Sequence, residues 1–299
     1  MNPNPEQILA LQDGSKLCYQ TFGSPDAMPI LFLSGGGQSM LSWHEAFLAK
    51  ICQEGTTPFY FIRYDIRDTG RSTHFALLPE DRRTYFLNDL CNDALALLDH
   101  LKVQSANMIG FSLGGGIAWS IAVNHPERVR SLTLISSSPV GPGPGPEDNI
   151  QGLDPELLKR IAAAPTPTNW HNREQAVKFL TYFESQMASE PLSVEEERES
   201  AERAGLAFDR AEIDGGAVNS FFNQQAAAWT RWPREDLNKV KCPTVVIHGR
   251  KDKNVPLRHG EVLREEIAGA KLVVIDRMGH DLPRRTWDEV VKTILGVVV

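Results

Sequence analysis

The sequence has no apolar run long enough to cross a bilayer and no excess of positive charge. Its 299 residues carry 31 Lys and Arg against 38 Asp and Glu, a formal net charge of −7. A membrane helix needs about 20 consecutive apolar residues, and nucleic-acid-binding domains are usually basic. We therefore expect no membrane span and no nucleic-acid partner. The N-terminal MNPNPEQILA also lacks the basic region and apolar run of a secretory signal, which predicts a cytoplasmic protein.

Cysteine is scarce as well. Cys18, Cys52, Cys91 and Cys242 lie far apart and form no C-x-x-C pair, which argues against a zinc site or a redox motif. We expect four reduced thiols and no metal. The remaining composition, 41% hydrophobic and 23% charged, is typical of a globular domain and excludes a disordered or coiled-coil chain.

Short apolar strands alternate with helical segments along the first half of the chain. A hairpin is predicted over 5–22, strands over 29–34, 59–64, 107–111 and 132–135, and helices over 41–53, 84–101 and 113–124. Alternation of this kind is typical of an α/β fold with a mostly parallel central sheet flanked by helices.

The alternation is interrupted after residue 138. Proline and glycine alternate over 139–147, which excludes a regular element there, and about 153 to 232 has a helical pattern. The α/β pattern returns at Pro243. We therefore predict a core formed by 1–139 and 237–299, with a helical insert at 140–236 after the sixth strand. The acidic residues of the insert between 190 and 202 predict a solvated face.

The segment Gly110-Phe111-Ser112-Leu113-Gly114 fits the pattern G-x-S-x-G. It ends a predicted strand and opens a predicted helix. A serine on such a sharp turn is held in a strained conformation with its hydroxyl exposed, as a nucleophile requires. The alternative is that Ser112 only caps the helix, which is common at strand–helix junctions.

A serine nucleophile needs a base, and the base needs an orienting carboxylate. Of the eight histidines, His280 follows the predicted strand KLVVID, at the sheet edge where open parallel sheets place their sites. Asp252 follows the strand TVVIHG at the same edge, although it could also be a turn aspartate. Asp276 and Asp281 are competing acids, but both are close to His280 in sequence. His248 is interpreted as structural.

A tetrahedral intermediate needs two N–H donors for its oxyanion. The N–H of Leu113, directly after Ser112, is the natural first donor. Glycines after the strand PILFLS supply the second, for which we favour Gly36, with Gly37 next. The alternative is that this glycine loop is only a flexible turn.

Five stretches of the chain resemble the α/β-hydrolase superfamily, namely LFLSGGG, RYDIRDTGRS, GFSLGGG, VIHGRKDKNVP and MGH. RDTGRS together with SGGG is similar to the aclacinomycin methylesterase branch of serine ester hydrolases, which hydrolyses methyl esters of polyketide-derived aromatic compounds. The resemblance implies that Asp65 and Arg67 are structural and tie a loop below the site. Asp68 stands where the family pattern has a glycine.

The resemblance also implies that the helical insert is a lid over Ser112. Its aromatic residues suggest a bulky apolar or polyketide-like substrate. The predicted pocket residues are Gly37, Trp170, Phe183, Phe222 and Trp229.

We expect a cofactor-free serine hydrolase of carboxylic esters that forms an acyl-enzyme on Ser112 and takes a small-molecule ester as substrate, as a monomer or a homodimer. Two alternatives remain. The same scaffold supports lactone or C–C bond hydrolysis and biosynthetic decarboxylation or cyclisation, and a ligand receptor could also keep this fold.

Overall fold

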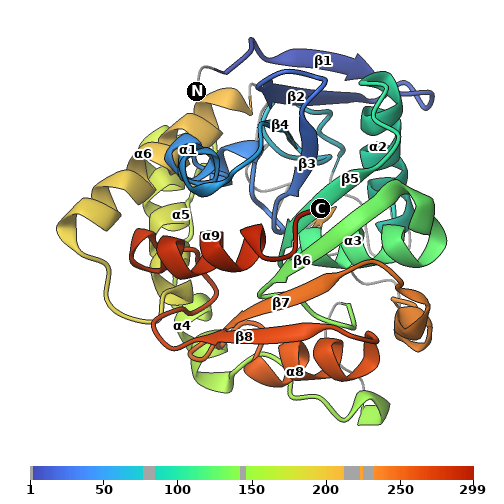
Figure 1. The fold of residues 1–299 in the computed structure, drawn as a ribbon. Coiled ribbons are helices and arrows are strands. Elements are labelled where there is room, and N and C mark those ends of the chain that lie inside the picture. The colour runs from blue at the N-terminus through green and yellow to red at the C-terminus, as the bar shows by residue number, and fades with distance from the viewer. Residues whose placement is uncertain (1–2, 77–84, 142–145, 212–222, 225–231) are drawn as a thin grey trace.

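The central element of the structure is one mixed sheet. The computed structural model describes residues 3–76, 85–141, 146–211, 223–224 and 232–299, and within them eight strands pair in the order β1-β2-β4-β3-β5-β6-β7-β8 (Figure 1). The strands are β1 (Gln7–Ala10), β2 (Lys16–Phe22), β3 (Met28–Leu33), β4 (Phe59–Tyr64), β5 (Ala106–Phe111), β6 (Val129–Ile135), β7 (Thr244–Gly249) and β8 (Lys271–Ile275).

The strand directions confirm the predicted fold class. β1 and β2 form an antiparallel hairpin around the turn at Asp13 and Gly14, and β2 pairs antiparallel with β4. Every other pairing, from β4 through β3 to β8, is parallel. The carboxyl ends of β5, β7 and β8 therefore meet at one edge of the sheet, where open parallel sheets place their ligand sites.

Helices cover both faces of the sheet, as a parallel sheet requires (Figure 1). The helices are α1 (Glu45–Glu54), α2 (Leu87–His100), α3 (Leu113–Asn124), α4 (Pro155–Ala162), α5 (Arg173–Met187), α6 (Val194–Arg210), α8 (Leu257–Glu266) and α9 (Trp287–Leu295). Residues of α2, α3 and α8 pack into one apolar core and those of α1 and α9 into the other. None of the helices in the described part of the chain is long and apolar enough to cross a membrane.

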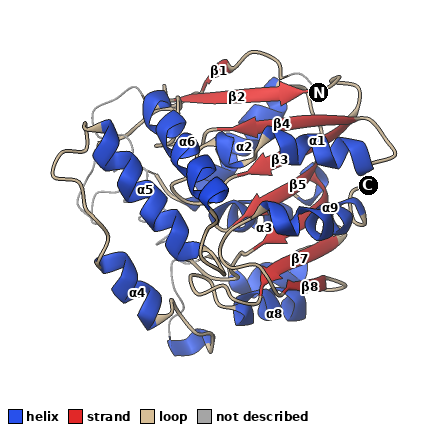
Figure 2. Cartoon of the chain, turned by 90° about the vertical axis from the view of Figure 1, so that its left-hand side faces the viewer, coloured by secondary structure: helices blue, strands red, loops and turns tan. Residues whose placement is uncertain are grey.

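Between β6 and β7 the chain forms α4, α5 and α6. Figure 2 shows these three helices together beside the sheet, at the edge to which the arrowheads of β3 and β5 point. Each helix begins at a polar cap: Asp154, Asn172 and Ser193 accept hydrogen bonds from N–H groups of the first turn. The last part of the helical pattern expected over about 153 to 232, from residue 212 on, falls largely outside the described residues.

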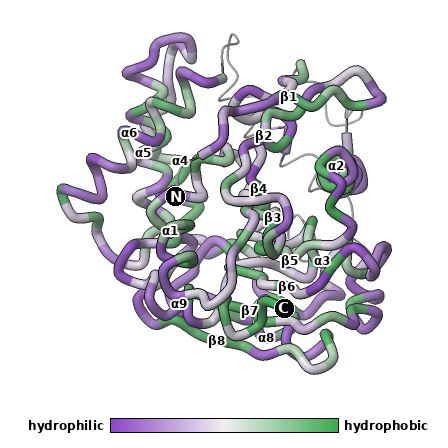
Figure 3. Tube along the Cα trace, turned by 45° about the horizontal axis from the view of Figure 1, so that its top comes forward, coloured by the Kyte–Doolittle hydropathy of each residue, from purple (hydrophilic) through white to green (hydrophobic). Residues whose placement is uncertain are grey.

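The acidic cluster of the insert is not simply a solvated face, so this prediction was wrong in part. α6 is coloured mostly hydrophilic over its first turns in Figure 3. Glu196 is bound by Arg285 at 2.7 Å and Glu199 by Arg284 at 2.9 Å. Because both arginines belong to the core, these carboxylates join the insert to the core. Sequence patterning does not reveal pairs that form between distant segments.

Candidate active site

Ser112 lies on the sharp turn between β5 and α3. Its backbone has φ 52° and ψ −117°, a conformation that non-glycine residues adopt only under strain. A Cβ at Gly114 would lie 2.1 Å from the carbonyl oxygen of Leu33, and one at Gly110 would lie 2.3 Å from that of Gly114. Glycine is therefore required at both positions, because the neighbouring backbone lies too close for a side chain. The side chain of Ser112 makes no capping hydrogen bond, so the structure does not support the N-cap alternative.

The imidazole of His280 lies between Ser112 and Asp252. Its Nε2 is 3.0 Å from Oγ of Ser112, and its Nδ1 is 2.8 Å from Oδ2 of Asp252. A carboxylate only accepts hydrogen bonds, so Nδ1 carries the proton and Nε2 faces the hydroxyl as an acceptor. The ring of Phe111 packs against the imidazole with centroids 5.1 Å apart. The structure therefore brings the three residues singled out in the sequence into one hydrogen-bonded line.

The buried carboxylate of Asp252 has two tasks. Its Oδ1 accepts hydrogen bonds from the N–H groups of Asn254 at 3.0 Å and Val255 at 2.8 Å, while Oδ2 faces His280. Burial raises the pKa of Asp252, but its interactions with His280, His248 and the N–H of Val255 outweigh burial, and the pKa lies below its ordinary value. The carboxyl is therefore ionised. Asp252 is thus a turn aspartate, as the alternative interpretation held, and it also contacts His280.

The other candidate acids are engaged elsewhere, whereas the second histidine, His248, packs against Asp252, with its Nε2 3.7 Å from Oδ2. Asp276 pairs with Arg250, and Asp281 accepts a 2.8 Å hydrogen bond from the N–H of Gly279. His248 is fully buried, its Nε2 lies 2.8 Å from the carbonyl oxygen of Val255, and burial lowers its pKa. These contacts agree with a structural interpretation of His248.

The glycine loop after β3 lies beside the first residue of α3. A Cβ at Gly36 would lie 3.8 Å from the side chain of Leu113. The N–H of Leu113 has no acceptor within its own helix, as at every helix start. The N–H of Gly37 donates a 2.6 Å hydrogen bond to Oε1 of Gln224. Nothing in the sequence singled out Gln224, because it comes from the helical insert, 187 residues away along the chain.

The turn after β4 carries the residues to which the resemblance assigns structural roles. Asp65 is fully buried, accepts a 2.8 Å hydrogen bond from the N–H of Met40 and pairs at 2.5 Å with Arg210 of α6. Arg67 binds both carboxylate oxygens of Asp93, at 2.6 and 2.7 Å. These contacts join the turn after β4 to Met40, which follows the glycine loop, to α2 and to the insert.

Asp68, which replaces the family's glycine, sits at φ +65°, the left-handed region that glycine favours. Its carboxylate accepts hydrogen bonds from the N–H of Phe75 at 2.6 Å and the hydroxyl of Tyr85 at 2.7 Å. Burial raises the pKa of this carboxyl. The two hydrogen bonds offset part of the cost of burying this carboxyl.

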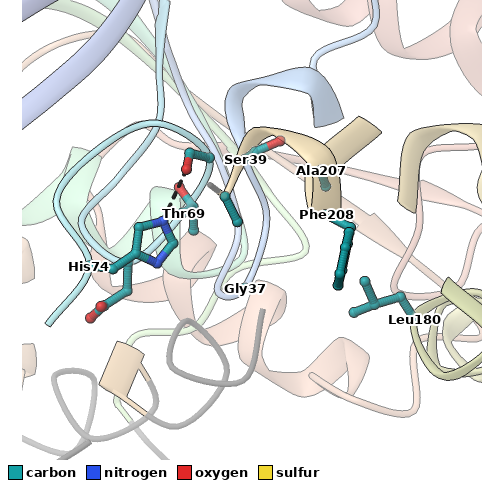
Figure 4. Close-up of a pocket in the computed structure, with 10 residues that line it drawn as sticks. Gly37, Ser39, Thr69, His74, Leu180, Ala207 and Phe208 are labelled. Atoms are coloured by element: carbon teal, nitrogen blue, oxygen red, sulfur yellow. Dashed lines mark hydrogen bonds between the residues drawn. The ribbon is translucent and has the colours of Figure 1, made fainter. Parts of the chain in front are cut away.

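A small pocket of about 30 Å³ opens between the turn after β4 and the insert. Figure 4 shows Gly37 and His74 of the core on one side and Leu180 and Phe208 of the insert on the other. Gly37 therefore lines a pocket. Within the described residues no group of His, Cys, Asp and Glu has the arrangement of a metal site.

Trp170 and Phe183 are not among the residues that line this cavity. Trp170 packs edge-on against Phe179, with ring centroids 5.1 Å apart, and Phe179 stacks on Phe183 at 6.4 Å. These rings form an aromatic row inside the insert. Phe222 and Trp229 lie outside the described residues.

The profile of the α/β-hydrolase fold family matches residues 28–283. The chain belongs to this family. It is 29% identical to the rhodomycin D methylesterase of Streptomyces peucetius over 291 residues, and this alignment covers 91% of each chain. Over 259 residues it is 27% identical to the 2-hydroxymuconate semialdehyde hydrolase of a Pseudomonas species, covering 84% of this chain and 80% of the relative.

A solved structure has the same fold. A hydrolase from Pseudomonas aeruginosa superposes with a TM-score of 0.70 at 28% identity, over 98% of this chain and 96% of that one. The chain is thus an enzyme of the α/β-hydrolase class, and it resembles the methylesterase branch.

Proposed function

We propose that the chain is a serine hydrolase of carboxylic esters, with Ser112 as nucleophile, His280 as base and Asp252 as orienting acid. The observation that carries this proposal is the hydrogen-bonded line of 3.0 Å from Ser112 to His280 and 2.8 Å from His280 to Asp252. Distances of this size allow direct proton transfer from the serine hydroxyl to the imidazole.

In the first half of the reaction, Oγ of Ser112 attacks the ester carbonyl carbon and its proton passes to Nε2 of His280. The ionised Asp252 stabilises the resulting imidazolium. The tetrahedral intermediate collapses, the bond to the alcohol oxygen breaks, and His280 returns the proton to the departing alcohol. The acyl group remains on Ser112.

In the second half, water attacks the acyl-enzyme while Nε2 of His280 accepts its proton. The carboxylic acid leaves and Ser112 recovers its hydrogen from His280. In both halves the N–H groups of Leu113 and Gly36 hold the oxyanion. Gly36 is the better second donor, because the N–H of Gly37 is already bonded to Gln224.

For the substrate, we propose a methyl ester on a bulky apolar or polyketide-like acyl group. The Streptomyces peucetius relative, whose alignment covers 91% of the chain, is a rhodomycin D methylesterase. The aromatic row at Trp170, Phe179 and Phe183 lies in the helical insert. We propose that this insert, residues 140–236, forms the lid and selects the acyl group.

The proposal is tested with a panel of methyl, aryl and lactone esters offered to the purified protein and to its Ser112→Ala variant. We expect the substitution to reduce kcat by orders of magnitude without changing thermal unfolding. Ser120→Ala is the matched control, because Ser120 is buried on the same helix and its hydroxyl has no partner among the described residues. Equal ester turnover by Ser112→Ala would overturn the mechanism.

Two other functions are distinguished by the same panel. Preference for a lactone would assign lactone hydrolysis, and turnover of 2-hydroxymuconate semialdehyde, added to the panel, would assign the reaction of the Pseudomonas relative. Tight binding of an ester with negligible turnover would indicate a ligand receptor.

A further inference from the structure

The loop that carries His280 is held by the helical insert as well as by the core. The backbone N–H of His280 donates a 2.8 Å hydrogen bond to the carbonyl oxygen of Met187, the last residue of α5. A Cβ at Gly279 would lie 2.4 Å from that same oxygen. The hydroxyl of Ser189 donates a 2.9 Å hydrogen bond to the carbonyl oxygen of Arg277. The position of the loop therefore depends on the segment of the insert that follows α5.

The guanidinium of Arg285 crosses this junction. Its Nη1 donates to Glu196 at 2.7 Å, its Nη2 donates to the hydroxyl of Ser189 at 3.1 Å, and its Nε donates to the carbonyl oxygen of Arg277 at 3.3 Å. Nη2 also lies 3.8 Å from Oδ2 of Asp281. The side chain is only 15% exposed, so solvent screens these contacts weakly. A planar group with several fixed donors suits such a junction better than a lysine.

We propose that Arg285 is a positioning residue for the reaction at Ser112. It fixes the loop on both sides of His280, at Arg277 and at Asp281, and ties that loop to the insert. Its described contacts include neither Ser112 nor the imidazole of His280, so it acts through the backbone of the loop. The inference rests on the proposed function, in which Nε2 of His280 must face the serine hydroxyl.

The expected kinetic effect follows from this geometry. Misplacing a reacting group by about 1 Å costs up to about 10²-fold in rate. Loss of the Arg285 contacts shifts the imidazole relative to Ser112. The hydrogen bonds of Arg285 reach Arg277, Glu196 and Ser189, none of which lines the pocket at Gly37. We therefore expect kcat to fall while KM stays nearly constant.

Arg284 offers a matched control. It binds Glu199 of α6 through Nε at 3.0 Å and Nη2 at 2.9 Å, and it lies over the ring of Trp287 at 4.8 Å. It thus makes the same kind of ion pair between core and insert. None of its described contacts is to residues 277–281.

The experiment compares Arg285→Gln, Arg285→Lys and Arg284→Gln with the unsubstituted protein. The measurements are kcat and KM for an aryl or methyl ester, the rate at which a fluorophosphonate labels Ser112, and thermal unfolding. We expect Arg285→Gln to lower kcat and the labelling rate about 10- to 100-fold, with KM changed less than about threefold. Arg285→Lys should recover part of the loss, and Arg284→Gln should stay within about threefold of the unsubstituted protein.

Unchanged kcat and labelling in Arg285→Gln, or equal losses in Arg284→Gln, would overturn the inference. If Arg285→Gln does not fold, Glu196→Gln removes one of the same contacts, and a kcat unaffected by that change would also overturn it. If the unsubstituted protein is labelled but hydrolyses no ester, the ester proposal fails while the labelling rates still test Arg285. Absence of any labelling at Ser112 would overturn both.

Discussion

The backbone N–H of Gly37 donates a 2.6 Å hydrogen bond to the side-chain oxygen of Gln224. The same side chain donates a 2.6 Å hydrogen bond to the carbonyl oxygen of Arg67 and is 1% exposed. One amide of the insert therefore joins the glycine loop after β3 to the turn after β4. It occupies the N–H of Gly37, while a Cβ at the neighbouring Gly36 would lie 3.8 Å from the side chain of Leu113.

Replacing Gln224 tests whether this bridge holds the glycine loop in place. In Gln224→Ala the Gly37 N–H loses its acceptor, so we expect the loop to move and kcat for ester hydrolysis to fall about tenfold or more. Gln186→Ala is the control, because Gln186 lies in α5 and donates a hydrogen bond to the neighbouring Ser185. Steady-state kinetics with both variants make the comparison, and equal kcat values would contradict the prediction.

Asp252→Asn tests the role of the buried carboxylate. Asparagine preserves an acceptor for the turn but can donate to Nδ1 of His280, which favours the wrong tautomer. We expect kcat to fall by about 10⁴-fold, with little change in folding. Asp276→Asn is the matched control, since Asp276 is an exposed carboxylate paired with Arg250. A kcat for Asp252→Asn near that of the control would contradict the prediction.

The buried pair of Arg210 and Asp65 predicts a large effect on stability. Asp65 is fully buried, and burial raises its pKa although the charge of Arg210 lowers it. Arg210→Met leaves this carboxylate without its cation and should cost about 3–5 kcal/mol of unfolding free energy. The double variant with Asp65→Asn should recover part of that loss. Denaturant unfolding gives the unfolding free energy of each variant. If the double variant is no more stable than Arg210→Met, the loss comes from packing and not from the unpaired charge.

Asp281 predicts a dependence of stability on pH. Burial raises its pKa to about 6, against the lowering effects of the Gly279 N–H and Arg285. Since the folded state then binds the proton more tightly than the unfolded state, the stabilising contribution is present at acid pH and is lost as pH rises through about 6. The difference in unfolding free energy between Asp281→Asn and the unsubstituted protein should therefore shift by about 2–3 kcal/mol in favour of the variant from pH 4 to pH 7. If the unfolding free energies of the variant and the unsubstituted protein differ by the same amount at pH 4 and pH 7, the prediction is wrong.

The fold was readable from local pattern. Apolar runs such as those of β4 and β7, separated by helical periodicity, predict a parallel sheet, because sheet and helix bury their apolar residues with different repeats. Ser112, Asp252 and His280 each follow one of these strands. Parallel strands end at a common edge, so residues far apart in the sequence can be expected there together. The sequence could not supply their distances or the hydrogen bonds that orient them.

The contacts between insert and core could not be read from the sequence. Glu196 and Arg285 lie 89 residues apart, and Gln224 and Gly37 lie 187 apart. Neither pair has a local signal, since an acidic helix face is usually solvated and a glutamine is common on any surface. The sequence by itself determined the mostly parallel sheet, the chain order of Ser112, Asp252 and His280 after its strands, and the presence of the insert. Only the tertiary structure decided which side chains of the insert hold the glycine loop and the histidine loop, because long-range pairing depends on how the helices pack.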